Sequence, residues 1–332
     1  MGRGWRLALR KVHGQAQALR ILEEALAQQR LASAYLFEGP AGVGKRSCAL
    51  ALAKQVIAKG RPDVEARIER GEHPDFRIFA PRDEGQGNLP VDFVRQEIRG
   101  LAQYAPFEAE HAFFVFPEVE RSLPLHTPAG ANALLKTIEE SRPGLHFLFL
   151  SHRPELVMTT LRSRAQRLPF RRLGHEAMGE ILAQLGLGGG DAELAAVLSD
   201  GSIGWALKWA EEGRVHALLE LLDGLMAWPF EGGTAAKALV DKLAADDLWR
   251  TLLPLWMRLQ HAALRAQSGA LEEAPTAWRQ RALALAEARP RERLLREFAT
   301  LSAWLRALQP TSNMTLALEA LMFSPSPLDF TL

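Results

Sequence analysis

The sequence predicts an α/β domain with a parallel sheet in the first half of the chain and an all-α second half. Three observations support this fold class. A glycine-rich turn, G-P-A-G-V-G-K at residues 39–45, joins an apolar strand to a helix. Strand-like apolar runs alternate with helical patterns as far as residue 169. Beyond residue 170 the strand-like runs disappear, and alanine- and leucine-rich helical stretches replace them.

Five short apolar runs predict the strands of the sheet. They occupy residues 35–37, 76–79, 112–116, 146–150 and 166–169. Continuous apolar runs are typical of strands in a parallel sheet that is covered by helices on both faces. Helical patterns lie between them, among them residues 15–30 and 90–103. The charged residues 59–72 lack a helical period, so they predict a surface connection.

Composition narrows the class of protein. The chain has 332 residues, of which 48% are hydrophobic and 24% charged, and its net charge is +1. These values predict a soluble protein of two or three domains. The net charge gives no indication that the chain binds nucleic acid or a membrane. The first residues lack an apolar signal core, so we expect a cytoplasmic protein. The single cysteine, Cys48, excludes a disulfide framework, and its place on an apolar helix stripe predicts burial.

The glycine-rich turn fits the phosphate-loop spacing G-x-x-x-x-G-K. The candidate phosphate-binding residues are Gly39, Gly42, Gly44, Lys45, Arg46 and Ser47. Glycines let backbone N–H groups converge on a phosphate, and the Lys45 ammonium would reach the terminal phosphates. The hydroxyl that holds Mg²⁺ in such loops is replaced by Arg46, and Ser47 follows one place late, about 100° around the helix. The loop therefore predicts phosphate binding with a defective metal site.

Three later motifs carry a resemblance to a known family. They are N-A-L-L-K-T-I-E-E at residues 132–140, an apolar strand ending at Ser151, and L-R-S-R-A-Q at residues 161–166. Together they resemble the core of the bacterial clamp-loader AAA+ subunits of DNA polymerase III. Further matches favour the delta-prime type: H-P-D at residues 73–75, G-S-I-G-W-A-L at 201–207 and N-M-T-L-A-L-E at 313–319.

The resemblance implies a division into three domains. An AAA+ P-loop α/β domain would span residues 1–170, a small helical lid domain residues 171–212, and a C-terminal helical collar residues 213–332. The collar would hold this chain in a hetero-oligomeric ring with ATPase and delta-type subunits. Through that complex the chain would serve the sliding clamp and primer–template DNA.

The departures from the family pattern concern ATP hydrolysis. Pro117 stands where the family has a metal-side aspartate, and Trp205 replaces the arginine of the second sensor turn. Glu118 could stand at the position of the general base, or Glu118 and Glu120 could belong to a solvated loop. Because phosphoryl transfer depends on metal and positioned charge, we expect no significant hydrolysis by this chain alone. ATP or ADP would bind weakly or without turnover.

Two other site residues follow from the resemblance. The family's S-R-C arginine projects into the nucleotide site of the neighbouring subunit, which makes Arg164, beside Ser163, a candidate arginine finger in trans. A surface arginine is the alternative. Ser151 lies where the family senses the terminal phosphate, although its hydroxyl could instead bond to the backbone. Relatives often carry a four-cysteine zinc module, but residues 59–72 contain no cysteine, so no zinc is expected.

Two classes of function remain after these comparisons. The first is a hydrolysis-deficient clamp-loader subunit that supplies Arg164 to a neighbour. The second is a catalytically active AAA+ ATPase that remodels protein or DNA, for which Lys45 and Glu118 are retained. A kinase or GTPase is disfavoured, because the all-helical second half has no place in it. Arg95 and Arg99 could contact a DNA backbone or could lie on a solvated helix face.

Overall fold

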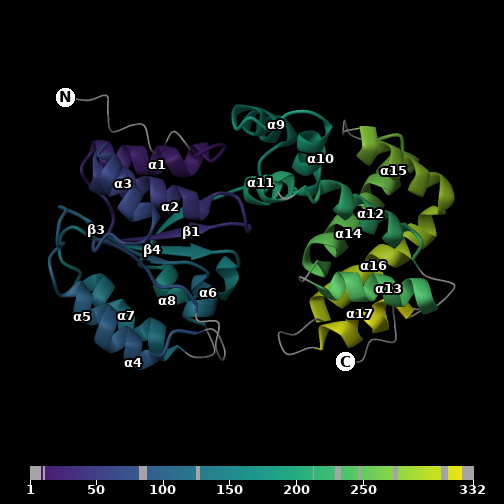
Figure 1. Cartoon of the computed structure of the whole chain (residues 1–332). Helices are drawn as coiled ribbons and strands as arrows, with labels where there is room; N and C mark the ends of the chain where they lie inside the picture. Colours follow the sequence, from purple (N-terminus) through teal and green to yellow (C-terminus); the bar gives the residue numbers. More distant parts are fainter. Residues whose placement is uncertain are drawn as a thin grey trace. The chain divides into compact units, whose positions relative to one another are not determined.

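The computed structural model describes residues 9, 12–81, 88–124, 128–211, 213–228, 233–245, 248–271, 276–307 and 313–323. The chain forms two compact units (Figure 1). The first consists of Met1–Ile181 with Asp200–Gly204, and the second of Leu182–Ser199 with Trp205–Leu332. The division into three domains at residues 170 and 212 stays a prediction.

The first unit is built on a five-stranded parallel sheet with the order β2-β3-β4-β1-β5. Its strands are β1 (Ala34–Glu38), β2 (Phe76–Ile78), β3 (Ala112–Phe116), β4 (Leu145–Ser151) and β5 (Gln166–Pro169). Strand β1 lies between the central strand β4 and the edge strand β5, so that Tyr35 pairs with Leu148 on one side and with Gln166 on the other. All five predicted strands are confirmed, and the phosphate loop leaves the sheet at the end of β1.

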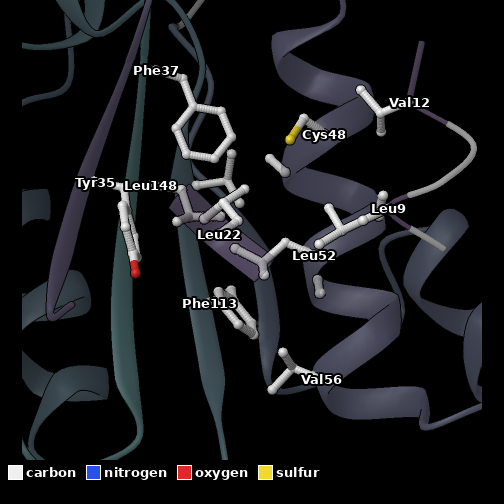
Figure 2. Packing of buried hydrophobic residues seen from close by; sticks show 14 of the residues in the cluster. Leu9, Val12, Leu22, Tyr35, Phe37, Cys48, Leu52, Val56, Phe113 and Leu148 are labelled. Carbon is white, nitrogen blue, oxygen red and sulfur yellow. The ribbon is translucent and has the colours of Figure 1, made fainter. Parts of the chain in front are cut away.

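One face of the sheet is covered by helices of the N-terminal region. They are α1 (Ala16–Ala27), α2 (Lys45–Ala53), its π-helical continuation η2 (Lys54–Ala58) and α3 (Pro62–Glu69). Figure 2 shows Cys48 and Leu52 of α2 turned toward Phe37 and Leu148 of the strands. Burial raises the pKa of the Cys48 thiol to about 12, so this cysteine is a small core hydrophobe, as the sequence predicts.

The opposite face is covered by helices from the middle of the unit. The segments α4 (Val91–Phe93), η3 (Val94–Ile98) and α5 (Arg99–Ala102) follow one another without a break, as the helix predicted at residues 90–103, and α7 is Ala129–Glu139. Leu36 points to this face, whereas its neighbours Tyr35 and Phe37 point to the other, as the two-residue period of a strand requires. Strand β1 is therefore buried by an apolar cluster on each face of the sheet.

Two short helices differ from the sequence-based expectation. Residues 59–72 contain the helix α3 rather than a surface connection, because Val64 and Ile68 are buried on one face at a spacing of four residues. Charged residues fill the other positions and hide this period. The helix α6 (Val119–Ser122) was also missed, and it begins directly after Glu118.

The H-P-D motif has a structural role in the first unit. The buried Asp75 carboxylate accepts hydrogen bonds from the backbone N–H groups of Phe107 at 2.6 Å, Glu108 at 2.8 Å and Ala109 at 2.9 Å. These bonds fasten the segment before β3 to the start of β2. One carboxylate thereby satisfies three backbone donors that would otherwise lack a partner.

The second unit is helical throughout its described residues. Its helices are α10 (Gly190–Leu198), α12 (Val215–Met226), α13 (Gly233–Ala244), α14 (Trp249–Gln267), α15 (Thr276–Ala288), α16 (Arg291–Ala307) and α17 (Met314–Phe323). The helices α9 (His175–Gln184) and α11 (Ile203–Glu211) each contain residues of both units. Indole N–H groups fasten α17, because Trp228 donates to the Leu321 carbonyl and Trp304 to the Ala317 carbonyl. Both tryptophans are core residues.

Candidate functional site

The phosphate loop leaves β1 in a conformation that only glycine adopts without strain. Gly39 has φ +149°, and a Cβ there would lie 2.0 Å from the Phe170 carbonyl oxygen. Gly44 has φ +97° and is the last residue before α2. Among the described residues, the N–H groups of residues 41–44 donate no hydrogen bond. Together with the free N–H groups of the first turn of α2, they suit a phosphate.

Lys45 is the buried cation of this loop, with a relative exposure of 4%. Its Nζ donates hydrogen bonds of 2.5 Å to the carbonyl oxygens of Gly39 and Pro40. Burial lowers the pKa of Lys45 to about 8, although the negative charge of Glu120 acts in the opposite direction. The ammonium therefore binds to its own loop and lies within the electrostatic reach of one carboxylate.

The residues after Lys45 do not provide the expected metal ligand. Arg46 and Ser47 are both exposed on the first turn of α2. The described part of the chain contains no group of three histidine, cysteine or acidic side chains that could hold a metal ion. The backbone of the loop thus fits the phosphates of a nucleotide, whereas the side chains of residues 46 and 47 do not reproduce the usual lysine–hydroxyl pair for Mg²⁺.

The structure separates the two acidic residues that follow β3. Glu118 has φ +48°, and its carboxylate accepts a hydrogen bond of 2.8 Å from Arg121. Glu120 instead accepts a hydrogen bond of 2.9 Å from the backbone N–H of His152, at the end of β4. The second oxygen of Glu120 is buried and has no hydrogen-bond partner among the described residues. The charge of Glu120 acts to raise the pKa of Lys45. The role of Glu118 as a general base stays a prediction.

Sequence reasoning could have found Glu120 if it had included the helix after residue 118. Val119 is buried within α6, and Glu120 follows it on the first turn of that helix. The sequence contains both acidic residues, and the assignment of Glu118 as a general base stays a prediction.

The end of β4 is tied to the beginning of the phosphate loop. The Ser151 carbonyl accepts a hydrogen bond of 3.2 Å from the Gly39 N–H. The buried Ser151 hydroxyl accepts one of 3.1 Å from the Arg153 N–H, and its role in sensing a terminal phosphate stays a prediction. The adjacent His152 has a lowered pKa, because of desolvation first and of the positive charge of Lys45 second.

Gln15 is a contact residue that sequence reasoning did not single out. Its buried amide Nε2 donates to the Val43 carbonyl at 3.1 Å and to the Arg171 carbonyl at 2.8 Å. Its Oε1 accepts a hydrogen bond of 2.9 Å from the Arg171 N–H. Gln15 thus couples the phosphate loop to the segment that follows β5. Gln15 directly precedes the amphipathic helix α1, and its neighbours His13 and Gln17 are also polar, so the sequence did not distinguish it.

Arg164 lies after the short helix α8 (Thr159–Arg162) and makes its contacts there and on α7. Its Nε donates to the Glu139 carboxylate at 2.5 Å, and its Nη1 donates to the Thr160 carbonyl at 3.2 Å. Ser163 donates its hydroxyl to the same carbonyl at 3.0 Å. None of the hydrogen bonds of Arg164 joins the phosphate loop of its own chain, and 37% of its side chain is exposed.

The remaining predicted residues lie at exposed positions. Arg95 and Arg99 are exposed on η3 and at the start of α5, one helical turn apart. Trp205 belongs to the second unit, where its ring stacks on Trp209 with a centroid distance of 5.7 Å. The Lys208 ammonium lies 5.3 Å from the centroid of Trp205. A tryptophan thus occupies this position as part of a local aromatic cluster.

Parallel strand order, a phosphate loop after the interior strand β1 and a following helical unit define a P-loop NTPase-type protein of the AAA+ fold class, as predicted. Comparison with known proteins places the first unit more closely. Residues 14–174 match the family described as DNA polymerase III, delta subunit.

Three relatives illustrate the similarity. The chain is 32% identical to the DNA polymerase III subunit gamma/tau of Mycobacterium tuberculosis over 223 residues, which are 65% of this chain and 37% of that protein. It is 28% identical to subunit delta' of Bacillus subtilis over 177 residues, 51% of each chain. It is 31% identical to subunit delta' of Pseudomonas aeruginosa over 162 residues, 46% of this chain and 47% of that protein.

These findings confirm the predicted resemblance to the delta-prime subunit of bacterial DNA polymerase III and to its clamp-loader AAA+ family. The chain spans between about a third and half of the length of these relatives. None of the described helices is long and apolar enough to cross a bilayer.

Proposed function

We propose that this chain is a delta-prime-like subunit of a DNA polymerase III clamp loader that does not hydrolyse ATP itself. The similarity to delta' and gamma/tau subunits supports the assembly, since those proteins are named as subunits of one polymerase. The chain would act in the cytoplasm, where the assembly loads the sliding clamp on primed DNA. ATPase and delta-type subunits would be its neighbours in the ring, and the second unit would supply the collar.

The lack of hydrolysis is supported by three substitutions in the chain. Arg46 replaces the metal-binding hydroxyl, Pro117 replaces an acidic residue after β3, and Trp205 replaces a sensor arginine. The Lys45 ammonium bonds to the carbonyls of its own loop. ATP or ADP would therefore bind through the loop N–H groups, weakly or without turnover, because the negative charge that develops during phosphoryl transfer lacks its usual partners.

The observation that carries the proposal is the placement of Arg164. Its guanidinium is held at the surface by contacts to α7 and α8 and makes no hydrogen bond to its own phosphate loop. A guanidinium is permanently charged and matches the geometry of phosphate oxygens. An arginine so placed is available to a nucleotide that a neighbouring subunit holds, so Arg164 would act in trans.

The test is reconstitution of the loader with Arg164→Ala. We expect the DNA-stimulated ATPase rate to fall by roughly two to three orders of magnitude, as arginine fingers in trans contribute strongly to phosphoryl transfer. Arg142→Ala is the matched control, because Arg142 is an exposed arginine of the same unit in the turn that precedes β4. An unchanged rate with Arg164→Ala, in a ring that still assembles, would exclude the finger.

Glu120 favours a second candidate function, an active ATPase. Its buried oxygen without a hydrogen-bond partner and its electrostatic effect on Lys45 suit a general base at the end of β3. The purified chain would then hydrolyse ATP, and both Lys45→Ala and Glu120→Gln would abolish turnover. Titration with labelled ATP in the presence and absence of Mg²⁺ separates the two functions, since binding that ignores Mg²⁺ supports the first proposal.

A further inference from the structure

The structure assigns Glu139 as the positioning residue of Arg164: its carboxylate, with the Thr160 carbonyl, fixes the guanidinium so that the Nη2 edge faces away from the chain's own contacts. This inference rests on the proposed role of Arg164 in trans. It identifies the residue of this chain that orients Arg164 before a neighbouring subunit binds.

The backbone beneath Arg164 is anchored by buried side chains and by backbone hydrogen bonds. Leu161 and Ala165 are buried in the same apolar cluster as Ile138 of α7. The Leu161 carbonyl accepts hydrogen bonds of 3.2 Å from the N–H groups of both Arg164 and Ala165. Since Ile138 precedes Glu139 directly, one packed cluster fixes the backbone at both ends of the Arg164–Glu139 ion pair.

The guanidinium is held along two of its edges. Nε donates to Glu139 Oε1 at 2.5 Å, and Nη1 donates to the Thr160 carbonyl at 3.2 Å. Within the described residues, the two N–H groups of Nη2 donate to no acceptor. Because Nε and Nη1 are engaged, the two N–H groups of Nη2 are the ones that can still bind two phosphate oxygens.

Ser163 completes this arrangement. Its hydroxyl donates at 3.0 Å to the Thr160 carbonyl that also accepts from Arg164. The Ser163 N–H donates at 2.9 Å to the Thr159 carbonyl. The hydroxyl therefore helps to orient the carbonyl, and we assign Ser163 to the same positioning set rather than to contact with nucleotide.

Because the ion pair is partly exposed to solvent, Glu139 can orient the Arg164 guanidinium without preventing it from binding another anion. The side chains of Arg164 and Glu139 are 37% and 51% exposed, and exposed pairs of this kind contribute little to stability. Such a contact restricts the rotamers of a long side chain but yields to a stronger anion. A nucleotide phosphate on a neighbour can therefore engage the free Nη2 edge while Glu139 keeps the orientation.

The experiment uses the reconstituted loader and steady-state ATP hydrolysis with primed DNA. We expect Glu139→Ala to lower kcat by roughly three- to tenfold, with an apparent KM for ATP within about twofold of wild type, because orientation rather than binding is lost. Glu139→Gln keeps an acceptor oxygen without the charge and should fall between the two. Glu140→Ala is the matched control, since Glu140 is the adjacent glutamate and lies 3.8 Å from Lys136 instead.

A double-mutant cycle distinguishes positioning from a general structural role. If Glu139 acts through Arg164, then Glu139→Ala has no further effect on kcat in an Arg164→Ala background. Equal losses in both backgrounds, or a wild-type kcat for Glu139→Ala while Arg164→Ala is impaired, would overturn the inference and leave the finger intact. An unaltered rate for Arg164→Ala alone would overturn the proposed function. Melting temperatures of each variant chain verify that folding is retained.

Discussion

The two units each contain an arginine–glutamate pair, and the two pairs have different surroundings. Arg289 and Glu297 in the second unit are 5% and 6% exposed, and the Arg289 guanidinium also donates to the backbone carbonyls of Met226 and Trp228. The side chains of Arg164 and Glu139 in the first unit are 37% and 51% exposed. An arginine–glutamate pair therefore joins helices when it is buried, whereas the same pair can still bind another molecule when it is exposed.

The buried pair is part of a wider hydrogen-bond network. Arg293 donates to Glu297 Oε1 at 2.9 Å, and the Gln260 amide donates to Oε2 at 3.2 Å. The Arg289 guanidinium carbon lies 5.4 Å from the centroid of the Trp256 ring. Burial lowers the pKa of Arg289, which expresses the cost of desolvating this charge. The network joins the ends of α12 and α15 to α14 and α16.

The largest effect is therefore expected for Arg289→Ala. Removal of one partner leaves a buried glutamate without its main counter-charge, which costs about 3–5 kcal/mol in the free energy of unfolding. Urea unfolding followed by tryptophan fluorescence measures it, because most of the tryptophans belong to the second unit. Arg279→Ala on the exposed side of α15 is the control. A loss below about 1 kcal/mol for Arg289→Ala would mean that the pair is not structural.

Asp75 extends the comparison to a buried carboxylate in the first unit. We expect Asp75→Ala to destabilise this unit by about 3 kcal/mol, because three backbone N–H groups lose an ionised acceptor. Asp75→Asn retains one acceptor oxygen and should cost less. Hydrogen exchange of the amides of residues 107–109 provides the measurement. Equal protection in Asp75→Ala and the wild type would show that the carboxylate does not hold this segment.

Buried histidine in the same unit gives a pH dependence. His146 is 4% exposed, its Nδ1 bonds to the Ala32 carbonyl at 2.8 Å, and its Nε2 lies 2.9 Å from Nδ1 of His111. Desolvation lowers the pKa of His146 to about 4. Since the unfolded chain takes up this proton near pH 6.5, stability is complete above that pH and falls as the pH decreases toward 4, by at most about 3 kcal/mol.

Thermal unfolding between pH 7 and pH 4 measures this dependence in the wild type and in His146→Gln. Glutamine does not titrate in this range, so the variant should lose less stability between the two pH values, whatever its stability at pH 7. Parallel pH profiles for the two proteins would assign the acid sensitivity to other groups.

The sequence predicted the residues whose role depends on a local period or motif. The apolar strand runs located all five strands, and the G-x-x-x-x-G-K spacing located the phosphate loop. It did not predict contacts between distant segments. Glu139 and Arg164 are 25 positions apart, and the role of Gln15 depends on Arg171 at the other end of the unit. Such pairs arise from the packing of helices and strands, and a short stretch of neighbouring residues carries no information about that packing.

The smallest change in the free energy of unfolding is expected for the exposed pair. Arg164→Ala should change the free energy of unfolding by less than about 1 kcal/mol, because both partners of the exposed pair are solvated after its loss. Urea unfolding of the isolated chain measures this value beside that of Arg289→Ala. A loss of several kcal/mol for Arg164→Ala would mean that its ion pair with Glu139 is a structural contact. A negligible loss, together with a large loss of ATPase rate in the ring, assigns Arg164 to the neighbour's nucleotide rather than to its own fold.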